Sequence, residues 1–424
     1  MSWINLRSEF IRSATVLMSG TVAAQAVGYL ITPLLTRIYT PEEIGELGIF
    51  LRIIGFLTAI VTARFELSIL LPRYEGHAFL LYRLAVRIMI ISSCVMITFL
   101  AFYLLFTGPD TNGMVVFSIL VLCTTVVMAF MNLGTNWSIR NQNFRQVSIQ
   151  RFVNSFTSNI FKLIFGYLSF GSTGLLLAVL IGAILSTFTY IKDYFNLYTK
   201  KFKNYSIKKM RVLGIEYKEF PLVNLPHVLT DLGRDMLIGL LIVSFFSKEI
   251  FGYFSHSYGM LRLPLIVIGA AVGQVFFQKC SKLNNNKEPI LPFVKNTLML
   301  LTGISVIPFA IIFFYGEPIF LFVFGDQWSV SGQYGEVMSI WLMINFIVSP
   351  LSSLPLVINK QKQFFVLSLF GSGLQLFGFG IIPLLLGTEP DVMVDILYLV
   401  SYTQIAYLVV VAIIMLQYSK KIKY

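Results

Sequence analysis

Long apolar runs recur along the whole chain, and they constrain the fold more than any other feature. Of the 424 residues, 56% are hydrophobic and only 12% are charged, whereas soluble domains contain about 25% charged residues. A run of about 20 apolar residues crosses a bilayer as one helix. The sequence therefore predicts an all-α polytopic membrane protein with about 12 transmembrane helices. We place these spans at residues 13–36, 44–71, 80–107, 113–136, 148–170, 174–195, 221–246, 250–277, 292–315, 334–358, 363–387 and 393–418.

The basic residues alternate between successive loops. Of the 32 Lys and Arg residues, 25 fall at the two ends of the chain or in and beside every second loop, two fall in the opposite loops, and five are assigned to the membrane interior. Eleven of the 20 acidic residues fall in or beside the opposite loops. By the positive-inside rule, both termini are expected in the cytoplasm. The net charge of +12 is thus a topology signal, and no nucleic-acid partner is predicted.

Motifs for metal, cofactor or catalytic chemistry are absent from the sequence. The three cysteines lack metal-ligand spacing, and no P-loop or H-E-x-x-H run occurs. The three histidines are scattered, and no loop is long enough for the extracytoplasmic domain of a glycosyltransferase or polymerase. We therefore expect a transporter rather than an enzyme, with no cofactor and no metal. The N-terminal apolar run lacks a small-residue cleavage site, so we expect a retained first helix.

One long basic loop divides the predicted spans into two groups of six. Residues 1–196 and 220–424 are predicted to form two six-helix bundles, joined by a cytoplasmic linker at 197–219. The linker could be a solvated loop or an amphipathic segment on anionic lipid. A weak repeat supports the division, since residues 39–45 match residues 246–252 in the pattern aromatic, hydroxyl, any, Glu, any, apolar, Gly. Such repeats are common in transporters, whose substrate sites lie between the repeats.

Eight charged residues are assigned to the membrane interior, when the charges near the ends of the spans are counted with the adjoining loops. A charge at bilayer depth costs at least about 2.5–3.5 kcal/mol, so it is expected to be paired or to face a cavity lined by protein. Five of the eight are cations, which predicts an anionic ligand. The eight residues are Arg52, Arg64, Glu66, Lys162, Asp231, Arg234, Asp235 and Arg262.

Helical spacing assigns roles to the charges of the second and fifth spans. In one continuous helix, Arg52 and Glu66 would share a face with small residues, as expected for a cavity wall. Arg64 points elsewhere, and we expect it to have a structural role, either in an ion pair or as a side chain that snorkels to the nearby interface. Lys162 shares its face with Asn and Ser residues, which fits either a hydrophilic path or hydrogen bonding between helices.

The seventh and eighth spans carry the strongest candidates. Asp231, Arg234 and Asp235 form one stripe, which is either a closed salt-bridge ladder or a cluster in which a carboxylate titrates and couples a proton or sodium ion. Glu66 is a third candidate for ion coupling. Tyr258 and Arg262 lie one turn apart with no acid in their own helix. Since arginine binds phosphate oxygens bidentately, Arg262 is the leading diphosphate ligand, with Arg52, Lys162, Arg234 and Tyr258 as further diphosphate or sugar ligands.

Two runs near the N-terminus form recognisable motifs, TPLLTRIYTPEEIG at residues 32–45 and RFELSILLPR at residues 64–73. They resemble the start of the Wzx-type O-antigen flippases, which belong to the polysaccharide transporter branch of the multidrug/oligosaccharidyl-lipid/polysaccharide exporter superfamily. Ile44 replaces the aromatic residue that usually precedes the glycine. The motifs cover about a sixth of the chain, and we transfer no substrate role to Arg37 or Glu66 from them.

The resemblance implies two bundles related by pseudo-twofold symmetry around a central cavity. It also implies alternating-access translocation of an undecaprenyl-diphosphate-linked oligosaccharide to the periplasmic face of a bacterial inner membrane. Polymerase and chain-length proteins of the same pathway are candidate partners, in addition to the lipid bilayer. An ion-coupled multidrug or metabolite exporter, and a membrane polymerase or acyltransferase, are the alternatives.

Overall fold

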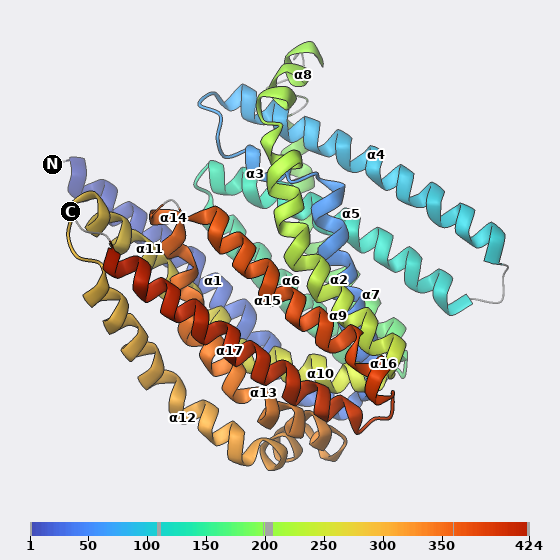
Figure 1. Ribbon diagram of the computed structural model, residues 1–424. Coiled ribbons are helices and arrows are strands. Elements are labelled where there is room, and N and C mark those ends of the chain that lie inside the picture. The colour runs from blue at the N-terminus through green and yellow to red at the C-terminus, as the bar shows by residue number, and fades with distance from the viewer. Residues whose placement is uncertain (1, 108–111, 198, 200–206, 359, 422–424) are drawn as a thin grey trace. The chain divides into compact units, whose positions relative to one another are not determined.

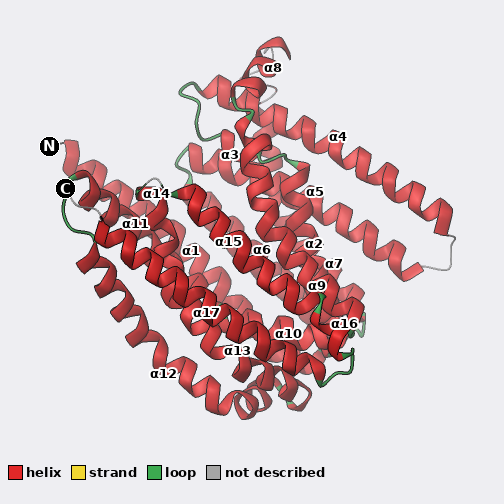
Figure 2. Cartoon of the chain, viewed as in Figure 1, coloured by secondary structure: helices red, strands yellow, loops and turns green. Residues whose placement is uncertain are grey.

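Every regular element of secondary structure in the described part of the chain is a helix. The structure is a computed structural model that describes residues 2–107, 112–197, 199, 207–358 and 360–421, and no strand occurs among them (Figure 2). Eight helices are long and apolar enough to cross a membrane, which confirms the prediction of a multi-pass, all-α membrane protein. They are Pro41–Val61, Glu75–Tyr103, Gly113–Arg140, Gly171–Asn196, Leu291–Phe324, Asp326–Val357, Gln361–Leu386 and Val392–Lys420.

The other four predicted spans are also helical in their described parts. They correspond to α1 (Ser2–Ile38), α6 (Phe144–Tyr167), α9 (Leu225–Phe245) and the pair α10 (Lys248–Leu261) and α11 (Ala270–Asn285). Helices α6 and α9 carry three charged residues each, and a π-helical turn separates α10 from α11. The number of about 12 spans stays a prediction.

The chain divides into two compact units, drawn with their helices labelled in Figure 1. The first comprises Met1–Tyr39 and Ile49–Met236, and the second comprises Thr40–Gly48 and Leu237–Tyr424. One boundary lies between α1 and α2 (Pro41–Val61), and the other two fall inside α2 and α9. The six-helix bundles at 1–196 and 220–424 stay a prediction.

In the first unit, α6 packs against α1 and α7, while α5 packs against α4 and α7. Phe79, Tyr82 and Trp137 form an aromatic core between α4 and α5. Besides α1 and α6, this unit contains α2 (Pro41–Val61, from Ile49 on), α3 (Phe65–Ser68), α4 (Glu75–Thr107), α5 (Asn112–Arg140), α7 (Gly171–Asn196), α8 (Ile207–Glu216), the π-helical turn η2 (Phe220–Asn224) and the start of α9.

In the second unit, α13 packs against α10, α12 and α17, and α15 packs against α17. Proline residues and the non-helical Tyr315 kink α12. The elements that follow α10 are the π-helical turn η3 (Leu265–Gly269), α11, α12 (Leu291–Phe324), η4 (Asp326–Trp328), α13 (Ser329–Val348), η5 (Ser349–Ser353), α14 (Leu354–Val357), α15 (Gln361–Gly380), α16 (Ile382–Leu386) and α17 (Val392–Lys421).

The two copies of the sequence repeat lie against each other in the second unit. A Cβ on Gly45 would overlap the carbonyl oxygen of Lys248, and a Cβ on Gly252 would overlap that of Pro41. The two contacts are reciprocal and obey the same offset of 207 residues as the repeat. An ion pair of 2.9 Å between Glu46 and Lys248 lies beside the crossing. The shared glycines are therefore explained by the close approach of two helix backbones.

The hydroxyl residues of the repeat begin the two helices. Thr40 and Glu43 form a capping box, in which each side chain accepts a hydrogen bond from the other residue's backbone N–H, at 3.3 and 2.8 Å. Ser247 accepts a hydrogen bond of 3.1 Å from the N–H of Ile250. The repeat thus encodes a capped helix start followed by a close crossing.

The second predicted span is broken, which corrects our expectation of one helix over residues 44–71. Helix α2 ends at Val61, and Ala63 and Arg64 adopt left-handed φ angles of 48° and 61°. Such a backbone costs of order 1–3 kcal/mol and persists only where its surroundings hold it. The prediction that Arg52 and Glu66 share a helix face assumed one continuous helix. Because the helix ends between them, the prediction does not hold.

Side-chain contacts hold the break in place. The guanidinium of Arg64 forms an ion pair of 3.0 Å with Glu66, whose side chain is 4% exposed. It also donates a hydrogen bond of 3.1 Å to the Asn224 side chain in η2. Arg140 donates three further hydrogen bonds to the carbonyl oxygens of Ile69, Leu70 and Pro72. The structural role expected for Arg64 agrees with these contacts.

We predict that Gly45→Ala and Gly252→Ala each destabilise the protein by about 2 kcal/mol or more, because a backbone carbonyl cannot move aside as a side chain can. Gly55→Ala in α2 and Gly259→Ala in α10 are matched controls, since a Cβ there meets nothing within 4 Å. Thermal unfolding of the purified variants in detergent measures the difference. Equal unfolding temperatures for the two pairs would contradict the close crossing.

Arg64→Ala is predicted to destabilise the protein by about 3 kcal/mol, because it leaves the Glu66 carboxylate buried without its cation. Adding Glu66→Gln to Arg64→Ala should restore part of the loss, because no buried charge then remains. Thermal unfolding of both single variants and the double variant tests this coupling. Additive losses would show that the ion pair does not hold the break.

Candidate functional site

The candidate site residues are distributed over both units. Tyr258 and Arg262 belong to the second unit, and all the others belong to the first. The residues of the first unit are Arg52, Glu66, Lys162, Asp231, Arg234 and Asp235.

Arg262 lies where the backbone of the eighth predicted span becomes irregular. Helix α10 ends at Leu261, Arg262 is its C-cap, and the π-helical turn η3 begins at Leu265. Pro264 cannot donate a backbone hydrogen bond to the preceding turn, which explains the break. Within membranes, irregular backbone is tolerated where it is buried in protein or lines a cavity. The span predicted at residues 250–277 is therefore interrupted by a turn at Arg262 and by η3, and the interruption coincides with the leading candidate residue.

An aromatic stack fixes the position of the Arg262 guanidinium. Its Cζ lies 5.0 Å from the centroid of the Tyr258 ring, and Nη1 donates a hydrogen bond of 3.3 Å to the Tyr258 hydroxyl. The Tyr258 ring stacks on Phe254 at 5.4 Å and packs against Trp341 of α13 at 5.9 Å. Three aromatic rings from two helices thus support one cation.

The Arg262 guanidinium has unused hydrogen-bonding capacity. Its Nε is buried without a hydrogen-bond partner, and no carboxylate of the described residues pairs with the side chain. A buried donor without a partner costs about 1–3 kcal/mol. An anion that approached this edge of the guanidinium would recover that free energy and compensate the charge.

Asp231, Arg234 and Asp235 form a closed salt-bridge ladder, which was one of the two interpretations of this stripe in the sequence. Arg234 contacts Asp235 at 2.9 Å and Asp231 at 3.5 Å, so one guanidinium serves two carboxylates. The Asp231 side chain is 62% exposed and that of Asp235 is 34% exposed. Asp231 is therefore the more weakly held and more accessible carboxylate.

Glu66 has a partner of its own. One carboxylate oxygen pairs with Arg64, and the other is buried without a hydrogen-bond partner among the described residues. This arrangement agrees with a structural role, and the role of Glu66 in ion coupling stays a prediction.

Lys162 and Arg52 are half-buried in the first unit. The backbone carbonyl of Lys162 accepts a hydrogen bond of 2.6 Å from the Tyr39 hydroxyl, whereas its ammonium group makes no hydrogen bond or ion pair with a described residue. Arg52 lies within the regular part of α2. Their roles in binding stay predictions.

Sequence reasoning missed two residues of this environment. Trp341 contacts Tyr258 from another helix, and no spacing in the sequence links residues 83 positions apart. Phe254 could have been found, since Phe254, Tyr258 and Arg262 recur at intervals of four on one helix face.

The chain matches known proteins in sequence and in fold. The sequence profile of the family described as "Polysaccharide biosynthesis protein" matches residues 34–333. No curated protein sequence matches the chain. Among solved structures, the lipid II flippase MurJ in an inward closed conformation superposes with a TM-score of 0.69 at 16% identity, over 96% of this chain and 87% of MurJ.

Two further structures are transporters of the MOP superfamily. An inward-facing multidrug resistance MATE family transporter has a TM-score of 0.62 at 10% identity, over 96% of this chain and 94% of its own. A transporter from Pyrococcus furiosus, described by the reverse polarity of its binding pocket, has a TM-score of 0.63 at 14% identity, over 98% and 96%. These likenesses show a shared fold. Since the profile covers most of the sequence, the chain belongs to the polysaccharide biosynthesis protein family and has the fold of MOP-superfamily membrane transporters.

Proposed function

We propose that this protein is a flippase for an undecaprenyl-diphosphate-linked oligosaccharide, an O-antigen or related surface polysaccharide repeat unit. It moves this lipid by alternating access from the cytoplasmic to the periplasmic face of a bacterial inner membrane, and both of its termini are cytoplasmic. The observation that carries the proposal is the Arg262 guanidinium, which is supported by aromatic rings and lacks a carboxylate partner among the described residues.

The chemistry of Arg262 favours a diphosphate. A guanidinium presents several N–H donors in a planar fork that matches two phosphate oxygens, and Tyr258 occupies only Nη1. The buried Nε remains for a second contact. Arg52, Lys162 and Arg234 are further proposed cationic contacts, and Tyr258 is a proposed contact to the diphosphate or the sugars.

A multidrug exporter is the main alternative, since the fold is shared by a lipid II flippase and by MATE transporters. A cationic drug would need an acidic cavity. In the predicted spans, Glu66 is paired with Arg64, and Asp231 and Asp235 are paired with Arg234. These pairs leave an excess of positive charge, and family membership also favours a saccharide substrate.

Ion coupling is proposed for the α9 cluster. Protonation of Asp231, or binding of a sodium ion to it, would free part of the Arg234 guanidinium. Asp231 suits this role better than Asp235, because its contact to Arg234 is longer and its side chain is more exposed.

Arg262→Ala is predicted to reduce surface polysaccharide at least tenfold at normal protein levels, since a hydrogen bond to a charged group contributes about 1.5–3 kcal/mol. Arg262→Lys should restore only part of the display, because an ammonium cannot form the bidentate fork. Arg211→Ala, which removes an exposed cation of α8, is the matched control. Wild-type display by Arg262→Ala would refute the diphosphate assignment.

Asp231→Asn is predicted to make transport insensitive to the proton or sodium gradient, with a smaller effect for Asp235→Asn. Uptake into inverted membrane vesicles, measured with and without each gradient, distinguishes the two variants. If both retain the gradient dependence of the wild type, the α9 cluster is only a salt-bridge ladder.

A further inference from the structure

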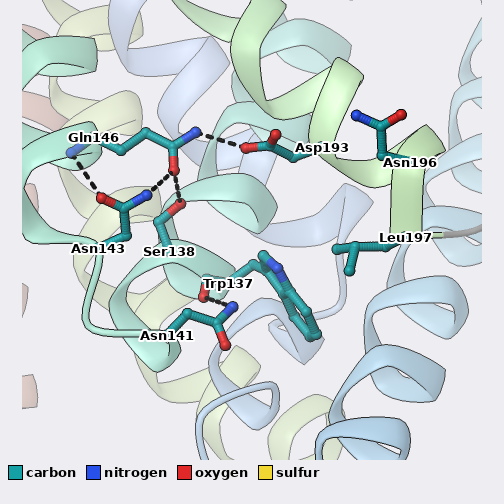
Figure 3. Close-up of a pocket in the computed structure, with 8 residues that line it drawn as sticks. All are labelled: Trp137, Ser138, Asn141, Asn143, Gln146, Asp193, Asn196 and Leu197. Atoms are coloured by element: carbon teal, nitrogen blue, oxygen red, sulfur yellow. Dashed lines mark hydrogen bonds between the residues drawn. The ribbon is translucent and has the colours of Figure 1, made fainter. Parts of the chain in front are cut away.

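Two adjoining cavities lie at one end of the first unit, between the end of α5, α6 and the last turns of α7. Their volumes are about 340 and 290 Å³, and both are lined by Asn143 and Gln146. We call them together the amide groove. The first cavity, shown in Figure 3, is lined by Trp137 and the polar residues Ser138, Asn141, Asn143, Gln146, Asp193 and Asn196. The second continues along α6 and α7 to Gln150, Ser186 and Thr189.

A hydrogen-bond network fixes the floor of the groove. The Gln146 amide donates to Asp193 at 2.7 Å and accepts hydrogen bonds from Asn143 at 2.7 Å and from Ser138 at 3.1 Å (Figure 3). Asn143 also caps α6 through the N–H of Gln146. These bonds orient the side chains before any ligand arrives, which lowers the entropy lost on binding.

Several polar groups around this floor have hydrogen-bonding positions that no described residue occupies. The Asn196 side chain makes no hydrogen bond with a described residue. One carboxylate oxygen of Asp193 and the side-chain oxygen of Asn141 accept no hydrogen bond from a described residue. The Trp137 ring, which packs against Phe79 and Tyr82, lines the same cavity. The groove therefore offers an amide donor, several acceptors and an aromatic surface.

The charges of the groove define the class of ligand. Among its lining residues, Arg145 and Asp193 carry opposite charges, and the other polar side chains are amides, hydroxyls and the Trp137 indole. Apolar side chains complete the walls, namely Ile149, Val153, Leu185 and Leu197. A phosphate would need an excess of cations, and a cationic drug would need an excess of carboxylates. Amide and hydroxyl groups with alternating donors and acceptors instead match an uncharged polyol. The two volumes together fall within the range of about 300–1,000 Å³ of small-molecule sites.

We propose that the amide groove is a binding site for an uncharged saccharide, with one pyranose ring in each cavity. The adjacent turn carries Arg140 and Arg145 and is expected in the cytoplasm. The saccharide would therefore be bound on the cytoplasmic side, where a lipid-linked repeat unit is assembled. Its identification as part of that repeat unit rests on the proposed function. Arg262 lies in the other unit, so sugar and diphosphate would be recognised by separate groups.

Saturation-transfer NMR on the full chain in lipid nanodiscs tests this site, with methyl glycosides of hexoses, 6-deoxyhexoses and N-acetylhexosamines as probes. We expect saturation transfer to at least one glycoside and none to methyl phosphate at the same site. Asn196→Ala should weaken glycoside binding about three- to tenfold, since one neutral hydrogen bond contributes about 0.5–1.5 kcal/mol. Because the Asn196 side chain makes no hydrogen bond with a described residue, the unfolding temperature should not change.

Asn285→Ala, at an exposed amide of α11, is the matched control and should bind like the wild type. Arg262→Ala should also retain glycoside binding, so a failure of the diphosphate assignment is separable from a failure of this one. Absence of saturation transfer to every glycoside, or equal binding by the wild type and Asn196→Ala, would overturn the proposal.

Discussion

Compensation of charge in a low-dielectric interior is the constraint on which this structure depends. A charged side chain at bilayer depth is tolerated when a partner or a polar cavity stabilises it. Glu66 is held by Arg64, and Asp231 and Asp235 share Arg234. Arg262 instead rests on an aromatic stack that supports its charge only in part. All three carboxylates are paired, whereas the charge of one arginine is compensated incompletely, and this difference is the physical basis for proposing an anionic substrate.

A second constraint is the close approach of α2 and α10. Gly45 and Gly252 admit backbone atoms where any side chain would collide, and each lies five residues after the residue that caps its helix. Helix α2 passes from one compact unit into the other between Gly48 and Ile49. The crossing therefore anchors an N-terminal segment of the chain within the C-terminal unit, at the residues that the repeat singles out.

The sequence predicts much of this protein because membrane helices are encoded locally. Apolar runs and alternating loop charges predicted the helical class, and the four-residue spacing of Tyr258 and Arg262 singled out the leading candidate residue. The breaks at Ala63 and Arg262 were not predicted, because the apolar runs continue through them. Some of the contacts that stabilise the first break come from distant residues, such as Asn224, 160 positions after Arg64. The contact between Trp341 and Tyr258 and the presence of the amide groove were not predicted either, because both are formed by residues from different helices. In the sequence, Asn141, Asn143 and Gln146 are indistinguishable from an ordinary polar loop.

The central claim is that an arginine without a carboxylate partner recognises a lipid diphosphate during translocation. Proteoliposomes containing a polyprenyl-diphosphate oligosaccharide test it directly, with an impermeant lectin reporting the sugars that reach the opposite leaflet. We expect wild-type protein to translocate the diphosphate lipid, an excess of the corresponding diphosphate without sugar to inhibit it, and Arg262→Ala to be at least tenfold slower. Equal translocation by wild type and Arg262→Ala would contradict the account.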